Sequence, residues 1–156
     1  MSHASPLLEW RSDEIPISTR FDDPYYSADH GLNETRHVFL TGNNLPERFQ
    51  DGFHIAELGF GTALNFLATL DLWRRAQQKG AFQFTTFEAF PMTPDDMIRA
   101  HLQFPDIAPL AQEFAPLWAS LLDAGQITGA DYTLTIKIGD ARDTLALWDQ
   151  RADCWF

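Results

Sequence analysis

The most constraining feature of the sequence is a short apolar run, residues 53–58, which breaks into the glycine loop Gly59-Phe60-Gly61. The run has the length of a buried strand, and the apolar-periodic segment that begins near Thr62 is typical of a helix. A strand, a glycine turn and a helix form the first half of a βαβ unit, so the sequence predicts an α/β domain. The glycines would let a ligand approach the backbone closely.

The loop departs from the Gly-x-Gly-x-x-Gly pattern of dinucleotide-binding domains, because Thr62 and Ala63 follow where more glycine would be expected. An acid, Glu57, stands at the end of the strand. A carboxylate there suits a ligand with a positive group and no pyrophosphate, such as S-adenosylmethionine with its sulfonium and amino group. The simpler alternative is a βα turn that uses glycine for its geometry alone.

Composition excludes several classes of protein. A chain of 156 residues is expected to form one domain, and its net charge of −11 argues against strong polyanion binding by this segment alone. The single cysteine, Cys154, is expected to be a buried thiol. The sequence shows neither an apolar run of about 18 residues nor a signal-peptide core, so a cytoplasmic setting without membrane contact is expected. No cysteine or second histidine accompanies His37 at metal-binding spacing, and no metal is assigned.

Two further strands are predicted, each with an acid at or shortly after its end. Residues 82–88 end in Glu88, which is placed to accept hydrogen bonds from ribose hydroxyls, although a solvated strand end would look the same. Residues 131–138 alternate between apolar and polar side chains, which predicts a strand at a sheet edge. Asp140 then either caps the following helix or meets an adenine amino group, and both interpretations stay open.

The chain divides into an arm, residues 1–50, and the first half of a cofactor-binding domain, residues 51–156. Tyr25 and Tyr26 in the arm would form a lid over a cofactor or, as the simpler alternative, plug the open end of the domain. Helices are expected over residues 63–78, from the Thr93 cap onward, and over residues 107–124 with breaks at prolines. Residues 153–156 begin a fourth strand where the sequence stops, so we expect a fragment whose exposed sheet edge promotes self-association.

Several motifs in order resemble one known family. They are Phe21-Asp22-Asp23-Pro24-Tyr25-Tyr26-Ser27, Gly31-Leu32-Asn33-Glu34-Thr35-Arg36, Val38-Phe39-Leu40-Thr41-Gly42-Asn43, Glu57-Leu58-Gly59-Phe60-Gly61-Thr62, Phe87-Glu88-Ala89-Phe90-Pro91 and Gly139-Asp140. Together they resemble the N-terminal methyltransferase domain of MnmC, the bifunctional tRNA-modifying family that completes 5-methylaminomethyl-2-thiouridine at the wobble position. The resemblance begins near residue 15 and continues to the end of the chain.

The resemblance implies a class I, Rossmann-like methyltransferase with a parallel sheet, flanking helices and S-adenosylmethionine as cofactor. It would methylate the amine of 5-aminomethyl-2-thiouridine in tRNA, after an FAD-dependent oxidase domain, absent here, has made that amine. Glu88 would hold the ribose and Asp140 the adenine, and the segment from Phe21 to Ser27 would close over the cofactor. The residues implied to contact the cofactor from the loop, its helix and the closing segment are Glu57, Gly59, Phe60, Gly61, Thr62, Asn65, Asp22 and Tyr25.

Two departures from the family pattern matter. Ala63 stands where the family has glycine, which narrows the turn and weakens the expected cofactor fit. The family's proposed catalytic aspartate would follow Phe156, so no catalytic residue is assigned and at most cofactor binding is expected. Two rivals remain: a methyltransferase of the same fold that acts on a small molecule or a protein, and a non-catalytic nucleotide-binding module.

Overall fold

The computed structural model describes residues 4–11, 15–25 and 31–156, and its centre is a five-stranded sheet with the order β6-β7-β5-β4-β8. Its strands are β4 (His54–Leu58), β5 (Phe82–Glu88), β6 (Gln126–Thr128), β7 (Tyr132–Ile138) and β8 (Cys154–Trp155). β4 pairs in parallel with β5 and β8, and β5 with β7. The chain therefore builds outward from β4 through β5 and β7, then returns to the other side of β4. Ligands in open α/β sheets bind at such a reversal, beyond the carboxyl ends of the strands.

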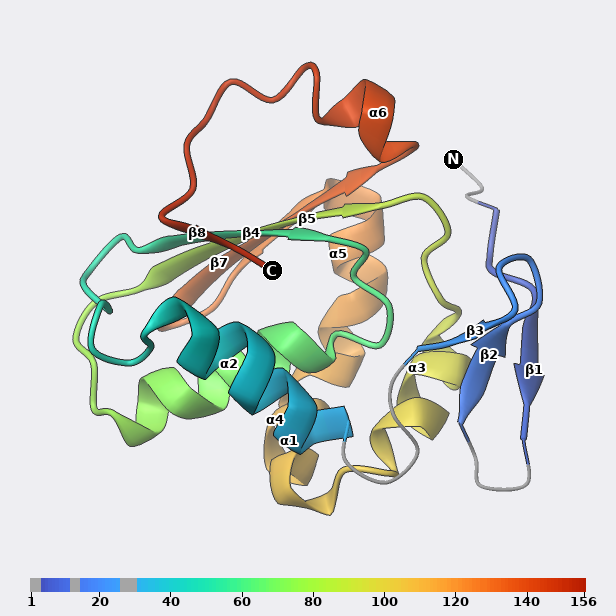
Figure 1. Ribbon diagram of the computed structural model, residues 1–156, viewed down its shortest axis with the longest axis horizontal. Coiled ribbons are helices and arrows are strands. Elements are labelled where there is room, and N and C mark those ends of the chain that lie inside the picture. The colour runs from blue at the N-terminus through green and yellow to red at the C-terminus, as the bar shows by residue number, and fades with distance from the viewer. Residues whose placement is uncertain (1–3, 12–14, 26–30) are drawn as a thin grey trace.

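Helices cover both faces of this sheet, as expected for a Rossmann-like α/β domain. α1 (Gly31–Thr35), α2 (Leu64–Arg75) and α4 (Ala108–Phe114) lie on one face, and α6 (Ala141–Thr144) lies on the other (Figure 1). α3 (Pro94–His101) and α5 (Trp118–Ala124) complete the α-helices among the described residues. A π-helical turn (Arg36–Leu40) and a 3-10 turn (Thr41–Asn43) follow α1, and further 3-10 turns connect α3 to α4 (Pro105–Ile107) and α4 to α5 (Ala115–Leu117).

Local sequence signals account for most of these boundaries. The Thr93 side chain accepts the Asp96 N–H, with Pro94 at the first position of α3, so the expected cap is confirmed. Prolines at positions 109 and 116 divide the stretch that follows into α4 and α5, as expected. α2 is amphipathic and ends before Gly80, which has a left-handed φ of 79°.

The core between α2, α4, α5 and the sheet is unusually aromatic. Phe66 lies at its centre, with its ring centroid 5.5 Å from that of Phe84 and 5.6 Å from that of Phe114. The fully buried large aromatic side chains of this core are Trp73, Trp118, Phe66, Phe82, Phe84 and Phe114, whereas Phe87 packs separately against Trp148 and Trp155. Edge-to-face and tilted contacts of this kind add to the area that each ring buries, so this layer anchors β4 and β5, the strands that carry the site.

Two features differ from the sequence-based prediction or extend it. β7 was expected at a sheet edge, but β6 pairs antiparallel with it and occupies that edge. The prediction was wrong because a three-residue strand gives almost no periodic signal. The arm contains a small antiparallel sheet of β1 (Leu8–Trp10), β2 (Pro16–Ser18) and β3 (Asp23–Pro24).

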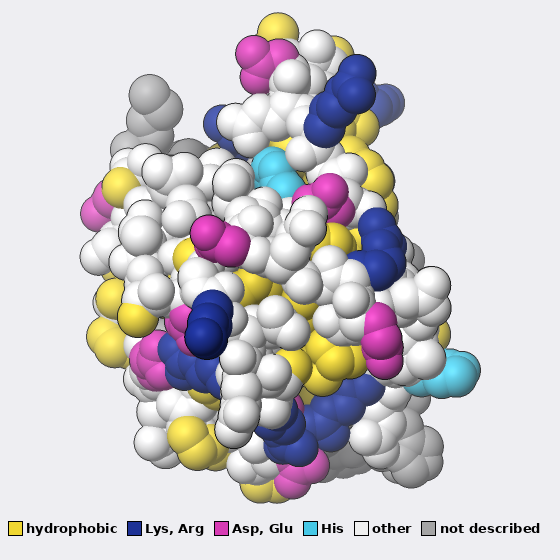
Figure 2. Space-filling model, turned by 90° about the vertical axis from the view of Figure 1, so that its left-hand side faces the viewer, with side chains coloured by type: hydrophobic (Ala, Val, Ile, Leu, Met, Phe, Trp, Pro, Cys, Tyr) yellow, Lys and Arg dark blue, Asp and Glu magenta, His cyan; other side chains and the backbone are white. Residues whose placement is uncertain are grey.

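β8 forms the other edge of the main sheet, which confirms the expected fourth strand. Its neighbourhood exposes apolar side chains among charged ones (Figure 2), and Trp155 and Leu147 are both exposed. The outward carbonyl of Trp155 accepts a 3.4 Å hydrogen bond from Asn43 Nδ2, which partly covers this edge. Self-association through this edge stays a prediction.

Candidate functional site

The glycine loop joins β4 to α2 at the carboxyl edge of the sheet. Three residues in this loop adopt left-handed backbone angles: Gly59 has φ 84°, Gly61 has φ 53° and Ala63 has φ 63°. A Cβ on Gly59 would meet no atom within 4 Å, so the backbone there is open to a ligand. The Gly59 N–H donates to the Phe87 carbonyl at 2.8 Å, which ties the loop to β5. Glycine is therefore needed here for geometry and leaves room for an incoming group.

Glu57 lies behind this loop, buried to 2% exposure. Its carboxyl oxygens accept hydrogen bonds from Asn65 Nδ2 and from Thr86 Oγ1, both at 2.8 Å. Burial raises the pKa of Glu57 to about 8, although these two donors oppose the shift. Its partner Asn65 lines the cavity and Glu57 does not, so Glu57 supports the loop from behind the lining.

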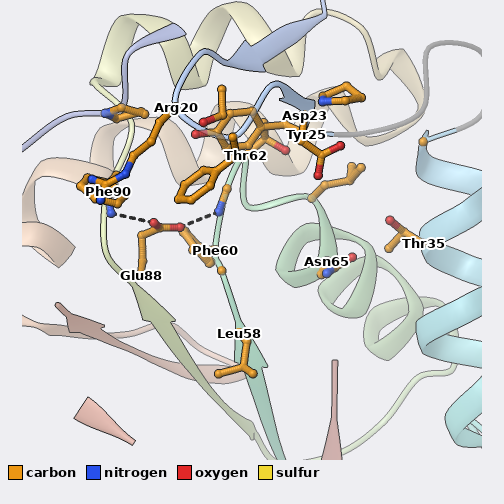
Figure 3. Close-up of a pocket in the computed structure, with 18 of the residues that line it drawn as sticks. Arg20, Asp23, Tyr25, Thr35, Leu58, Phe60, Thr62, Asn65, Glu88 and Phe90 are labelled. Carbon is orange, nitrogen blue, oxygen red and sulfur yellow. Dashed lines mark hydrogen bonds between the residues drawn. The ribbon is translucent and has the colours of Figure 1, made fainter. Parts of the chain in front are cut away.

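Glu88, the last residue of β5, braces the loop from the cavity side. Its Oε2 accepts the Gly61 N–H at 3.0 Å, and its Oε1 accepts the Phe90 N–H at 2.8 Å (Figure 3). A carboxylate offers about four lone-pair positions, so two remain for further donors. The structure thus brings Glu88 and the loop together, as the sequence predicted for two neighbouring strand ends.

These groups line a cavity of about 1170 Å³, which is ample for a nucleoside that carries an amino acid. Loop residues Gly59, Phe60, Gly61 and Thr62 form one wall. Among the described residues, the acids along the lining are Asp23, Glu34 and Glu88, against one basic side chain, Arg20. Arg20 lies over the Phe90 ring at 4.5 Å and its charge is partly engaged there. The lining is therefore net acidic, which favours a cationic ligand.

Tyr25 covers the loop from the arm. A Cβ placed on Gly61 would lie 3.1 Å from the Tyr25 ring, so the ring packs directly on the Gly61 backbone. Burial, followed by the negative charges of Glu88 and Asp96, raises the pKa of Tyr25 to about 12. Tyr25 therefore stays a neutral phenol that closes one side of the cavity, a position compatible with both the lid and the plug. Tyr26 and Ser27 lie outside the described residues.

The remaining two expected contacts lie away from the lining. Asp140 caps α6: its Oδ1 accepts the Arg142 N–H at 2.9 Å, and its Oδ2 lies 2.6 Å from Arg142 Nη2. Hydrogen bonds from the Arg142 side chain and backbone lower the pKa of Asp140 to about 2. The cap is therefore confirmed, and contact with adenine stays a prediction. Asp22 is exposed with φ 50°, and its neighbour Asp23 lines the cavity instead.

Some lining residues were not assigned from sequence, namely Arg20, Asp23, Glu34, Thr35, Leu58 and Phe90. Glu34 and Phe90 stand within the motifs Gly31–Arg36 and Phe87–Pro91, so their motif membership was the available signal. Within residues 4–11, 15–25 and 31–156, no group of three or more metal-ligating side chains occurs. In the same ranges, no helix has the length and apolar character needed to cross a bilayer.

The chain is similar in sequence to known proteins that share one name. A protein from Azoarcus sp. (strain BH72), named tRNA 5-methylaminomethyl-2-thiouridine biosynthesis bifunctional protein MnmC, is 40% identical over 95% of this chain, which covers 24% of that protein. The protein of the same name from Magnetococcus marinus is 42% identical over 96% of this chain, which covers 23% of it. The chain thus spans about a quarter of the length of the curated relatives it matches. No protein-family model matches the chain.

A solved structure has the same fold. The crystal structure of MNMC2 from Aquifex aeolicus superposes with a TM-score of 0.70 at 20% sequence identity, covering 99% of this chain and 50% of that one. At this identity the comparison shows the fold alone, which is that of a Rossmann-like α/β domain.

Proposed function

We propose, because the chain is homologous to part of the MnmC proteins, that it forms the cofactor half of an S-adenosylmethionine-dependent tRNA methyltransferase. The substrate would be the amine of 5-aminomethyl-2-thiouridine at the wobble position of tRNA. The observation that carries this proposal is the net acidic cavity between the glycine loop and the Glu88 strand end. It coincides with about 40% identity to proteins named for this modification.

The residues present fit the cofactor. Bound S-adenosylmethionine would supply an electrophilic methyl group on a sulfonium. The open backbone at Gly59 leaves room for its amino-acid part, and the two unused lone pairs of Glu88 suit ribose hydroxyls. The acidic lining favours the positive sulfonium and ammonium groups. Adenine contact by Asp140 would require it to share its carboxylate with Arg142.

Methyl transfer is an in-line displacement, so the protein contributes mainly by positioning the two reactants. The nucleophilic amine must be neutral, and a nearby carboxylate would accept its proton. β8 brings Phe156 alongside the loop, where its carbonyl accepts the Leu58 N–H at 3.4 Å. Leu58 lines the cavity, so the residues that follow Phe156 in the family pattern, a leucine and then an aspartate, would emerge beside it. This is where the family resemblance places the catalytic aspartate, and no residue of 1–156 is assigned that role.

The whole enzyme would contain more than these residues. The relatives are named bifunctional, and we assign the second activity, FAD-dependent oxidation, to a domain outside these residues. Residues 1–50 act as arm and lid, and residues 51–156 as half of the cofactor domain. The reaction takes place in the cytoplasm, without a metal or a membrane. The acidic charge of −11 means that the tRNA-binding surface lies largely elsewhere in the enzyme.

The same charge favours one alternative, a methyltransferase of this fold that acts on a small molecule or a protein. An activity assay distinguishes the tRNA methyltransferase from this alternative. The longest gene product that contains this chain is incubated with S-adenosylmethionine and with tRNA bearing 5-aminomethyl-2-thiouridine. Mass spectrometry of the nucleosides should show one added methyl group on that base. Unmodified tRNA, together with methylation of a small amine or a protein, would replace the tRNA proposal by the alternative. Tight binding of ATP or NAD in place of S-adenosylmethionine would indicate a nucleotide-binding module.

A further inference from the structure

The cofactor loop has a support that lies outside the cavity. His101 is the last residue of α3, and its Nε2 lies 2.7 Å from the carbonyl oxygen of Thr62. A carbonyl can only accept a hydrogen bond, so Nε2 must carry the proton. The 39 residues between the two partners make this a tertiary contact that links α3 to the loop.

The backbone of the loop explains why such a donor is needed. Ala63 has φ 63°, so the regular hydrogen bonds of α2 begin at the Ala63 carbonyl, which accepts the Leu67 N–H at 3.0 Å. The preceding carbonyl, that of Thr62, does not take part in the regular hydrogen bonds of α2. Thr62 is only 4% exposed, and a buried carbonyl without a donor is costly. His101 supplies that donor.

The surroundings of His101 indicate that its main role is the hydrogen bond to the Thr62 carbonyl. The side chain is 6% exposed, and Nδ1 has no hydrogen-bond partner among the described residues. Burial lowers the pKa of His101, while the hydrogen bond to Thr62 opposes the shift, so the ring is neutral near pH 7. Thr62 lines the cavity on its other side. The loop is thus held between Glu88 on the cavity side and His101 behind it.

We propose that His101 is a positioning residue, whose Nε2–H fixes the Thr62 carbonyl and thereby holds residues 59–63 in the conformation that faces the cavity. The effect on the loop is independent of any ligand. The effect on cofactor binding rests on the proposed function.

The test compares His101→Gln with His101→Leu by amide hydrogen exchange of the ligand-free chain. Gln can place its Nε2 donor near the position of the histidine Nε2, whereas Leu cannot donate. We expect exchange of the amides of residues 59–63 to quicken about tenfold in His101→Leu, relative to the amides of β5, since a buried carbonyl loses its donor. His101→Gln should restore most of the protection. Leu121→Ala, a fully buried position on α5, is the control for general loss of stability.

Either of two results would overturn the proposal: unchanged exchange in the loop of folded His101→Leu, or an even rise across the sheet like that of Leu121→Ala. If His101→Leu does not fold, His101→Asn takes its place, because its amide is too short to reach the Thr62 carbonyl. A calorimetric titration with S-adenosylmethionine should then show about tenfold weaker binding in the donor-deleting variant and near-native binding in His101→Gln. Absence of binding by the wild-type chain would count against the proposed function, while the exchange result would still decide the role of His101.

Discussion

Glu57 offers a quantitative test of the buried network behind the loop. Its pKa is raised from an ordinary value of 4.5 to about 8, chiefly by burial. The folded chain therefore holds this proton more tightly than the unfolded chain does. The resulting stabilisation is fully present below pH 4.5 and is lost as the pH rises toward 8. At 1.36 kcal/mol per pKa unit, this one group should lower the free energy of unfolding by about 3–4 kcal/mol between pH 5 and pH 8.

The perturbation is Glu57→Gln, which keeps the shape of the side chain and removes the titration. The new amide oxygen can accept from Asn65, and the amide nitrogen can donate to the Thr86 hydroxyl. Urea unfolding followed by tryptophan fluorescence would give the free energy of unfolding at several pH values. We expect the two proteins to agree within about 1 kcal/mol at pH 5 and Glu57→Gln to be more stable by about 3–4 kcal/mol at pH 8.

The difference between wild type and variant cancels the titration of all other groups, so it isolates Glu57. Glu47→Gln, at an exposed acid, is the control and should change stability by less than about 0.5 kcal/mol at every pH. A stability difference between wild type and Glu57→Gln that stays constant from pH 5 to pH 8 would refute the buried, proton-holding carboxyl.

Three further substitutions test local geometry through the free energy of unfolding. Ala63→Gly should lower the free energy of unfolding by about 1–2 kcal/mol less than Ala68→Gly does. Both alanines are buried, but only Ala63 has a left-handed φ, whose strain glycine relieves. Equal losses in the two variants would contradict that strain. Thr93→Ala should cost about 1 kcal/mol by removing the cap on the Asp96 N–H, and no loss would mean that the cap does not stabilise α3. Gly61→Ala should cost about 1–3 kcal/mol, because φ is 53° and the new methyl group meets the Tyr25 ring, and a neutral result would show that the ring is not packed there.

The parts of the fold that sequence predicted well are those with local signals. Residues that are neighbours in the sequence specify the strand, glycine loop and helix around residues 53–66. The same holds for the cap at Thr93. The placement of Glu88 beside the loop followed from the general rule that parallel strands end at one edge. The Asp140 cap was recognisable because its donor is only two residues away.

The parts that sequence missed depend on tertiary contacts. The four residues before Leu58 in β4 are all buried, so no alternation of polar and apolar residues shows that Glu57 turns away from the cavity. The hydrogen bond from His101 spans 39 residues and belongs to no pattern. The antiparallel sheet of the arm is made of two- and three-residue strands, too short for periodicity to reveal.

The most direct test of the central claim is a calorimetric titration of S-adenosylmethionine into this chain and into Glu88→Ala. We expect saturable one-site binding that S-adenosylhomocysteine competes for, and a loss of at least about tenfold in affinity in Glu88→Ala, because both the ribose acceptor and the brace on Gly61 are removed. No binding by the folded chain, or binding that Glu88→Ala leaves unchanged, would contradict the assignment of this cavity as the cofactor site.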